Sequence, residues 1–300
     1  MRKFLTITIF LIIIVAIGSH SKTIQNWIIK NFVYDVPSVI ERQNDYALNR
    51  SFDFVQITDN LNPKNKQDVL NIIYTFLDSG SDDFSFFCEY SECKRDIEKL
   101  SEENKYSKLN NFVHPFNSFN KINIHTSAAN RIRITVEKTY SEEDIKFINT
   151  EIDKIVEEHI KENMTIREKI TAFHDHIINI TRYDTEYLDV AITNPTHPSN
   201  TALGPLRYGK SLCGGYTDVM TIYLNRLNVT NYKISSKEHI WNLIYFENEW
   251  LHIDLTWNDP VTDDGRDILS HRFLLITTED LESINTEAHE FNKSVFVEAK

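Results

Sequence analysis

Three residues in the last third of the chain have the types and the order needed for thiol catalysis. Cys213 comes first, His239 follows it, and Asp254 comes third. A thiol becomes a strong nucleophile when a base takes its proton, and an imidazole base needs a third group to hold the right tautomer. Together the three side chains could form a thiolate that attacks an amide carbonyl. Taken singly, a cysteine or a histidine is more often a buried structural residue.

The segment after Cys213 predicts a helix that begins at the cysteine. Apolar residues recur at helical spacing from Tyr216 to Leu227, and Gly214 and Gly215 directly follow the cysteine. The first N–H groups of a helix have no partners within it, so this end favours a negative charge. The position therefore favours a thiolate, and the same N–H groups could bind the oxyanion formed during attack.

His239 and Asp254 are predicted to lie on the two strands of a hairpin. Apolar-rich segments running from His239 to Trp257 flank a polar turn at Glu247-Asn248-Glu249. With an even-numbered loop both side chains lie on one face of the sheet. They are directly opposed if the loop is Phe246-Glu247 and diagonal neighbours if it is Glu247-Asn248. An odd-numbered loop or a bulge would put them on opposite faces.

The N-terminus has the pattern of an export signal. Met1-Arg2-Lys3 is basic, and residues 4–18 are apolar apart from two threonines. This run is short for a membrane span, which needs about 20 residues, but it suits a signal peptide. We assign residues 1–21 to a signal peptide or signal-anchor. The protein is expected outside the cytoplasm, either secreted or attached to the membrane through residues 4–18.

Export makes the other two cysteines informative. Cys88 and Cys93 are separated by four residues, and in an oxidising compartment such a pair can form a disulfide. The alternative is two small buried thiols. If the pair is bonded, Cys213 is left as the free thiol.

The charge and the motifs of the sequence limit the classes of partner and ligand that the protein is expected to bind. The formal net charge is −12, with 44 acidic and 32 basic residues, which argues against nucleic acid as a partner. No metal site is predicted, because His174, His176 and His252 lack the number and spacing of zinc ligands. We place His174 and His176 on an exposed helix face. No cofactor motif occurs in the sequence.

The rest of the chain divides near Tyr140. Residues 22–140 are expected to form a mainly helical region of unknown function, beginning with a spacer to about residue 50. Residues 141–300 are expected to form the catalytic domain. The elements predicted from periodicity and capping are helices around 69–77 and 94–109, a strand at 131–137, and helices that begin at the capping boxes Ser141 to Asp144 and Thr165 to Glu168.

Three blocks resemble the core of the transglutaminase-like superfamily: Gly209 to Tyr216, His239 to Asn242, and Trp250 to Pro260. The resemblance covers roughly residues 165–273. It implies an α+β, papain-like fold in which a helix bearing the cysteine packs on an antiparallel sheet bearing the histidine and the aspartate. Carried over, it implies that Cys213 is the nucleophile, His239 the base and Asp254 the orienting carboxylate.

The resemblance also implies a substrate cleft and an activity. Residues that match the family's cleft are Tyr183, Asn200, Gly214, Trp241, Asn242 and Trp257. Gly214 stands where animal cross-linking transglutaminases have tryptophan, so the sequence is more similar to the exported bacterial group. The implied reaction is acyl transfer from a protein or peptide amide, without a cofactor. Water as acceptor would make a cysteine protease or deamidase, and lysine would make a cross-linking enzyme. The alternative is a catalytically silent binding or scaffold module at the cell surface.

Overall fold

The structure is a computed structural model that describes residues 38–127, 130–194, 196–262, 268–284 and 287–300. The predicted leader at residues 1–21 lies outside this range. Among the helices of the described residues, none combines the length and the apolar character that a membrane span requires.

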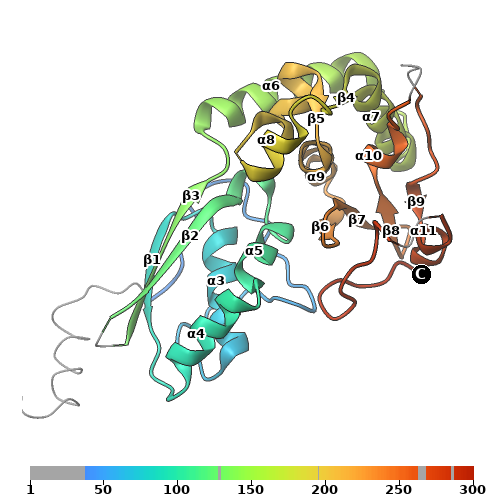
Figure 1. The fold of residues 1–300 in the computed structure, drawn as a ribbon. Helices are drawn as coiled ribbons and strands as arrows, with labels where there is room; N and C mark the ends of the chain where they lie inside the picture. Colours follow the sequence, from blue (N-terminus) through green and yellow to red (C-terminus); the bar gives the residue numbers. More distant parts are fainter. Residues whose placement is uncertain (1–37, 128–129, 195, 263–267, 285–286) are drawn as a thin grey trace, which may run out of the picture.

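The region before Tyr140 combines helices with a sheet. Its elements are α3 (Lys66–Asp78), β1 (Asp83–Phe87), α4 (Cys93–Glu102), α5 (Lys105–Lys108), η2 (Leu109–Asn111), η3 (Pro115–Asn117), β2 (Phe119–Thr126) and β3 (Arg131–Lys138). The strands form an antiparallel sheet in the order β1-β3-β2, which lies beside α3 and α4 in Figure 1. The structure adds this sheet to the helices predicted for the region, and the strand predicted at 131–137 is confirmed. The helix predicted over 94–109 is broken at Asn104, whose φ is +55°.

The segment predicted as a spacer is, over its described part, packed on the fold. The backbone N–H groups of Leu48 and Asn49 donate to the Asp78 carboxylate at the end of α3, both at 2.9 Å. Arg50 reaches the other half of the chain and donates to the Val229 carbonyl at 3.3 Å. The spacer prediction is therefore wrong for residues 38–50, which join the two halves.

The second half contains the elements that carry the candidate site. They are α6 (Glu142–His159), α7 (Ile166–Ile180), β4 (Arg182–Tyr183), α8 (Leu188–Thr193), η4 (Pro198–Asn200), η5 (Gly204–Tyr208), β5 (Lys210–Ser211), α9 (Cys213–Arg226), β6 (Thr230–Ser235), β7 (Ile240–Phe246), β8 (Glu249–Ile253), α10 (Leu255–Asn258), β9 (Leu274–Ile276) and α11 (Thr278–Ile284). Both predicted capping boxes are present: Ser141 caps α6 with Asp144, and Thr165 caps α7 with Glu168.

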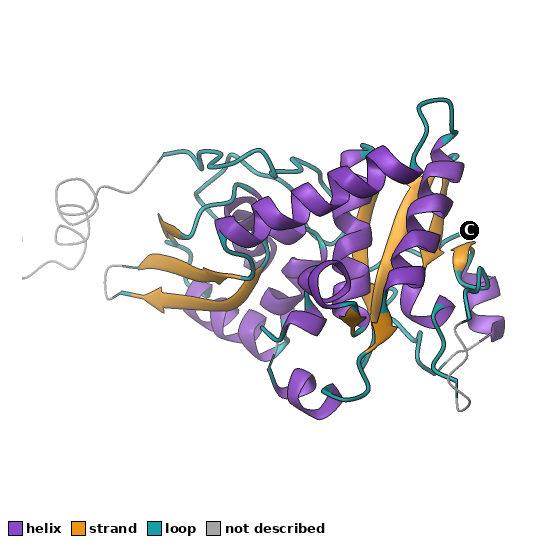
Figure 2. Cartoon of the chain, turned by 90° about the horizontal axis from the view of Figure 1, so that it is seen from above, coloured by secondary structure: helices purple, strands orange, loops and turns teal. Residues whose placement is uncertain are grey.

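A four-stranded antiparallel sheet, in the order β6-β7-β8-β9, separates two hydrophobic cores. One core is formed with α6, α7 and α9 and includes Phe173, Tyr223 and Ile253. The other is formed with the N-terminal region and the C-terminal segment, where Tyr232 of β6 packs on Phe112 at a ring distance of 5.0 Å. The two halves thus share a core across the predicted boundary, and Figures 1 and 2 show the two sheets at opposite ends of the molecule. The predicted arrangement of a cysteine-bearing helix packed on an antiparallel sheet is confirmed.

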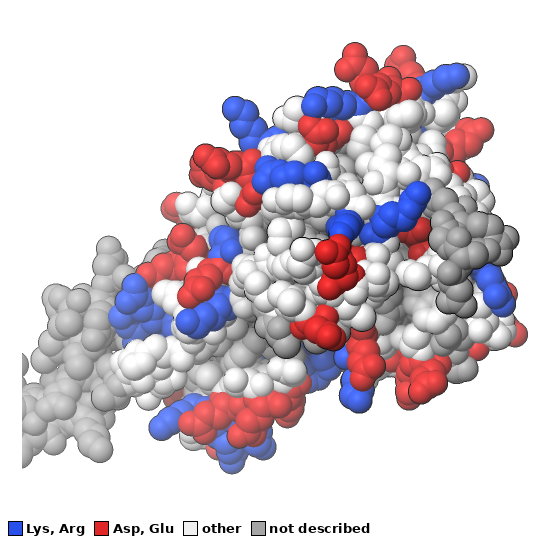
Figure 3. All heavy atoms as spheres, turned by 45° about the horizontal axis from the view of Figure 1, so that its top comes forward, with Lys and Arg blue, Asp and Glu red and all other residues white. Residues whose placement is uncertain are grey.

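The acidic excess is not collected on one side of the face shown in Figure 3, where Lys and Arg side chains are interspersed with Asp and Glu. Several charged residues form exposed pairs, such as Arg226 with Asp153 at 2.5 Å and Arg133 with Asp83 at 2.5 Å. Such exposed pairs contribute little to stability, because water and salt screen their charges. Stability therefore rests mainly on the two cores.

Candidate active site

Cys213 is the first residue of α9, as predicted, and its side chain is partly exposed. Leu212, in an extended conformation, forms the N-cap without a side-chain hydrogen bond. The positive end of the helix dipole therefore acts on the thiol without a competing side-chain oxygen. Within the described residues Cys213 is the free cysteine, because Cys88 and Cys93 are joined by a disulfide.

The two glycines after Cys213 let the start of α9 pack against η4. A Cβ on Gly214 would lie 2.7 Å from the Asn200 carbonyl oxygen, and one on Gly215 would lie 2.7 Å from the Ser199 carbonyl oxygen. The N–H of Leu212 donates to that same Ser199 carbonyl at 2.7 Å. The glycines thus fix the cysteine against the 198–201 segment through close backbone approach.

His239 directly precedes β7 and Asp254 directly follows β8. The hairpin loop is Glu247-Asn248, with φ values of +56° and +68°, and Phe246 opposes Glu249. This is the register that predicted diagonal neighbours. His239 Nε2 and Asp254 Oδ2 are 2.5 Å apart.

The chain leaves the strand at Asp254, so the strand predicted to continue to Trp257 is wrong beyond Ile253. The Asp254 Oδ1 atom accepts a hydrogen bond from the Trp257 N–H at 3.2 Å and thereby caps the one-turn helix α10. The carboxylate has a second function beyond its contact with His239. It starts the turn that places the Trp257 ring beside the histidine.

The charges of the pair are strongly coupled. Asp254 is only 1% exposed. Burial alone would raise its pKa, but the charge and hydrogen bond of His239 and the contact with His289 hold that pKa well below its usual range. Burial lowers the pKa of His239, but the charge and hydrogen bond of Asp254, with contributions from Cys213, outweigh burial and raise it to about 10. The raised pKa therefore favours the imidazolium form of His239 at neutral pH.

Cys213 lies on the other side of His239. The thiol interacts with the imidazole and contributes to its raised pKa. Since Nε2 is held by Asp254, Nδ1 is the ring nitrogen left for the thiol. The structure thus brings together all three predicted catalytic residues, in the order thiol, imidazole, carboxylate.

Thr217 connects α9, which begins at Cys213, to β7, which directly follows His239. Its hydroxyl is 2.7 Å from the Cys213 carbonyl and 3.0 Å from the Ile240 carbonyl. Asn242 of β7 donates to the Thr217 carbonyl at 3.1 Å and to the Thr221 hydroxyl at 2.7 Å. These buried bonds hold the backbones of the thiol and imidazole at a constant separation.

Two of the six residues expected to line the cleft are buried instead. Trp241 is 0% exposed and Asn242 is 1% exposed. Trp241 stacks beneath the His239 ring at 5.4 Å and 15°, and donates its indole N–H to His252. The Asn242 side-chain amide is hydrogen-bonded to α9. Because alternate residues of β7 point into the two cores, neither side chain lies at the surface. Both residues therefore support the site from inside the protein.

The other four predicted lining residues are partly exposed. Tyr183 of β4 opposes Ser211 of β5. Burial, followed by the charges of Cys213 and Asp254, raises the pKa of Tyr183 to about 12. The Trp257 ring is edge-on to His239 at 6.5 Å. Asn200 and Gly214 lie against each other beside the thiol.

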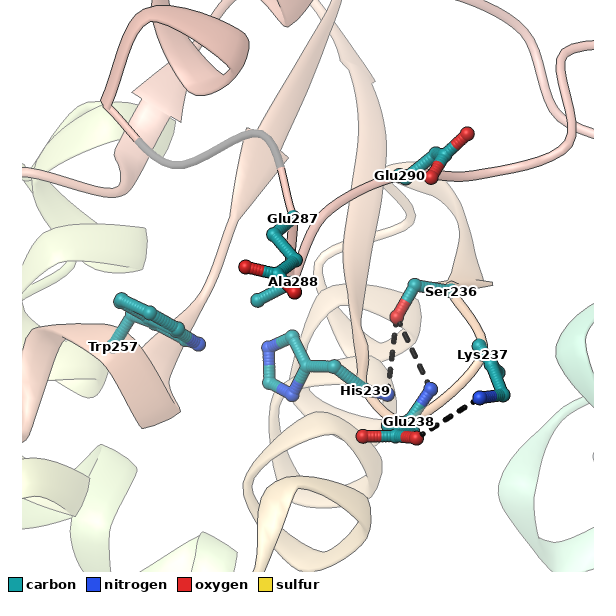
Figure 4. A pocket seen from close by; sticks show the side chains of 8 residues that line it. All are labelled: Ser236, Lys237, Glu238, His239, Trp257, Glu287, Ala288 and Glu290. Carbon is teal, nitrogen blue, oxygen red and sulfur yellow. Dashed lines mark hydrogen bonds and ion pairs between the residues drawn. The ribbon is translucent and has the colours of Figure 1, made fainter.

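A pocket of about 550 Å³ opens beside His239. Its lining combines His239 and Trp257 with residues from two chain segments far apart in sequence: Ser236, Lys237, Glu238, Glu287, Ala288 and Glu290. Figure 4 shows the Trp257 indole nitrogen directed toward the histidine, with Glu287 and Ala288 above the histidine ring. The Ser236 hydroxyl accepts from the His239 backbone N–H at 3.1 Å, which fixes the turn before β7.

His289 is a site residue that the sequence did not indicate. It is 0% exposed, and its Nε2 lies 2.9 Å from Asp254 Oδ2. The residue stands in the irregular segment after α11, with no periodicity or motif around it. Only the folded chain brings it to the carboxylate.

His174 is buried, so its predicted exposed position was wrong. The Asn258 Oδ1 atom accepts from the Phe273 N–H at 2.9 Å, which directs Nδ2 of the same amide to His174 Nε2 at 2.9 Å. That nitrogen must accept, so the proton of the neutral ring is on Nδ1 and is donated to Asp175 at 2.8 Å. The sequence did carry a signal: His174 lies four residues after Ile170, on the buried face of α7.

Among the described residues, two clusters have the composition of metal ligands, and hydrogen bonds account for both. In one, His174 Nδ1 is a donor by the reasoning above, which leaves no lone pair for a cation beside Asp175 and His271. In the other, His239 and His289 both direct Nε2 at one oxygen of Asp254. Distances of 2.5 and 2.9 Å to the same oxygen are those of charge-assisted hydrogen bonds.

No protein-family model matches the chain, and no curated protein matches it. Its fold is similar to the solved structure of a transglutaminase (TGase), with 16% identity and a TM-score of 0.36, over 61% of this chain and 53% of the other. It is also similar to a provisionally assigned cysteine protease from Cytophaga hutchinsonii, with 12% identity and a TM-score of 0.28, over 50% of this chain and 65% of the other. Each match spans less than two thirds of this chain and less than two thirds of the matched chain. The described geometry has the arrangement expected from the sequence, an α+β fold with the cysteine at the start of a helix and the histidine and aspartate at the ends of two strands of an antiparallel sheet.

Proposed function

We propose that the chain is a thiol enzyme that transfers acyl groups from protein or peptide amides. One observation carries this proposal: His239 is hydrogen-bonded to Asp254 and interacts with Cys213, and Cys213 lies at the N-terminus of α9. A cation held beside a thiol at a helix N-terminus stabilises the thiolate. The raised pKa of His239 supports the same charge state.

In the first half-reaction the Cys213 thiolate attacks the carbonyl carbon and forms a C–S bond. The negative charge moves to the carbonyl oxygen, which the N–H groups at the start of α9 can receive. The C–N bond then breaks as the His239 imidazolium gives its proton to the departing amine. The products are a free amine, an acyl-thioester on Cys213 and a neutral imidazole.

In the second half-reaction water or an amine attacks the thioester. His239 takes a proton from this acceptor, the new C–O or C–N bond forms, and the C–S bond breaks to release the thiolate. Water completes a protease or deamidase reaction, and a lysine side chain completes cross-linking. Asp254 stays ionised throughout and keeps the imidazole aligned.

Incubation with glutamine-bearing and lysine-bearing peptides tests the proposal. Mass spectrometry separates cleavage, deamidation and conjugation by product mass, and each of these outcomes supports acyl transfer with a different acceptor. Cys213→Ala is the matched control and should abolish every product. Products that persist in this variant would overturn the proposal, as would a Cys213 thiol that alkylates near pH 6 no faster than an ordinary thiol with a pKa of about 8.5.

We further propose that the protein acts outside the cytoplasm. The basic start and the apolar run at residues 4–18 support export, and the Cys88–Cys93 disulfide suits an oxidising compartment. Expression in a bacterial host followed by fractionation tests this, with a version lacking residues 1–21 as the control. Recovery of the full chain in the cytoplasm with reduced Cys88 and Cys93 would contradict it.

A further inference from the structure

His289 is enclosed within the site by aromatic rings. Phe273 stacks on it at 5.4 Å and 20°, while Trp241 and Trp257 meet it at 4.9 and 5.2 Å. The His239 ring stands perpendicular to it at 5.3 Å and 88°. An imidazole buried in such surroundings is costly unless its polar atoms are hydrogen-bonded. Its bond to Asp254 therefore explains why a histidine is tolerated there.

The flanking residues show that the segment turns this one side chain inward. Glu287 and Glu290 are exposed and line the pocket beside His239. Figure 4 shows both side chains among those that line it. His289, between them, is fully buried. The C-terminal segment thus forms one wall of the pocket on its outer side and contacts the carboxylate on its inner side.

The Asp254 carboxylate is held by three donors. Its Oδ2 atom accepts from both His239 and His289, and its Oδ1 atom accepts from the Trp257 N–H. An ionised carboxylate only accepts, so both imidazoles present N–H at Nε2. Without His289 the Oδ2 atom loses one of its two donors, and the carboxylate is held less firmly against rotation relative to His239.

We propose that His289 is a positioning residue, which holds the Asp254 carboxylate in the orientation that keeps His239 aligned with Cys213. The inference rests on the proposed function and adds a fourth residue to that site. His289 does not touch the reacting atoms; it acts through Asp254. Its contribution to the low pKa of Asp254 agrees with this role.

The test uses Cys213 itself and needs no substrate. Thiolate formation is followed by ultraviolet absorbance against pH, with the Cys213→Ala protein as baseline, and the alkylation rate with iodoacetamide is measured over the same range. The groups that face His289 are Asp254, His239 and His252. Burial, followed by the charge of His289, lowers the pKa of His252 to about 3. His252 therefore stays neutral near and above neutral pH. The change in absorbance and rate at high pH then reports the Cys213–His239 pair.

His289→Phe keeps an aromatic ring and removes the donor, and His289→Gln keeps an N–H at a similar distance from the backbone. We expect His289→Phe to lower the pH at which the imidazolium is lost by about one to two units, the effect of losing a hydrogen bond to a charged group. It should also slow alkylation, because the imidazole is no longer held in line with the thiol. His289→Gln should restore most of both effects. Unfolding midpoints confirm that the variants are folded, and His289→Leu replaces His289→Phe if the latter does not fold.

If Cys213 is activated in the wild-type protein, and His289→Phe or His289→Leu leaves its pH titration and alkylation rate unchanged, the inference is overturned and the proposed function stands. Equal losses in the Phe and Gln variants would also overturn it, since they would indicate a packing role. An unactivated thiol in the wild-type protein would overturn the proposed function, and the inference with it.

Discussion

Replacing Asp254 by asparagine should remove the imidazolium from His239 at neutral pH. In the wild-type protein the carboxylate raises the pKa of His239 to about 10 against the effect of burial. Without that charge burial dominates, and the pKa should fall to about its ordinary value of 6.5 or below. The change corresponds to roughly 5 kcal/mol of preference for the charged ring.

The substitution keeps the shape of the side chain but cannot satisfy its neighbours. His239 and His289 direct N–H groups at one oxygen, and the Trp257 N–H is directed at the other. An amide offers an oxygen on one side only, so its NH₂ group must face a donor whichever way it is turned. The asparagine side chain would therefore disturb either the imidazole pair or the start of α10.

Thiolate absorbance and alkylation measure the outcome. Near pH 7.5 the imidazolium fraction should fall from nearly complete to about a tenth or less in Asp254→Asn, and the thiolate that depends on it should fall in parallel. His239→Ala should give the same loss, and Cys213→Ala supplies the baseline. A thiolate titration in Asp254→Asn that overlays the wild-type curve would refute the assigned geometry.

The same pair predicts how stability depends on pH. The pKa of His239 in the folded protein, about 10, is above its ordinary value of 6.5. Its contribution to the free energy of unfolding is therefore fully present below about pH 6.5 and is lost as the pH rises through about 10. Thermal unfolding across that range should show this loss in the wild-type protein and a smaller one in Asp254→Asn. Equal losses in both would contradict the coupling. Substitutions at three further sites test the surrounding structure. Gly214→Ala should lower the free energy of unfolding by about 1–3 kcal/mol in urea titrations, because its Cβ would meet the Asn200 carbonyl at 2.7 Å; an unchanged midpoint would contradict the close packing. Replacing Cys88 and Cys93 by serine should cost about 2 kcal/mol, and alkylated intact mass should gain two labels in the wild-type protein only after reduction. Thr217→Val should cost about 1 kcal/mol by thermal unfolding and slow Cys213 alkylation, whereas Thr217→Ser should do neither.

Features that depend on neighbouring residues were predictable from the sequence. The capping boxes at Ser141 and Thr165 form because the cap and the third helical residue satisfy each other's backbone N–H groups within one turn. The start of α9 at Cys213 follows in the same way from helical spacing after the cysteine. Hairpin parity placed His239 and Asp254 on one face because side chains alternate along a strand, and the two-residue loop confirmed the diagonal register.

Features that depend on partners distant in the chain were decided by the tertiary structure. Burial of Trp241 and Asn242 follows from the helix and the core that cover β7. The turn at Asp254 arises where α10 meets α7 through the bond between Asn258 and His174. His289 reaches the carboxylate only because the C-terminal segment folds back over the site, where an ionised group excluded from water needs donors that no local pattern in the sequence could specify.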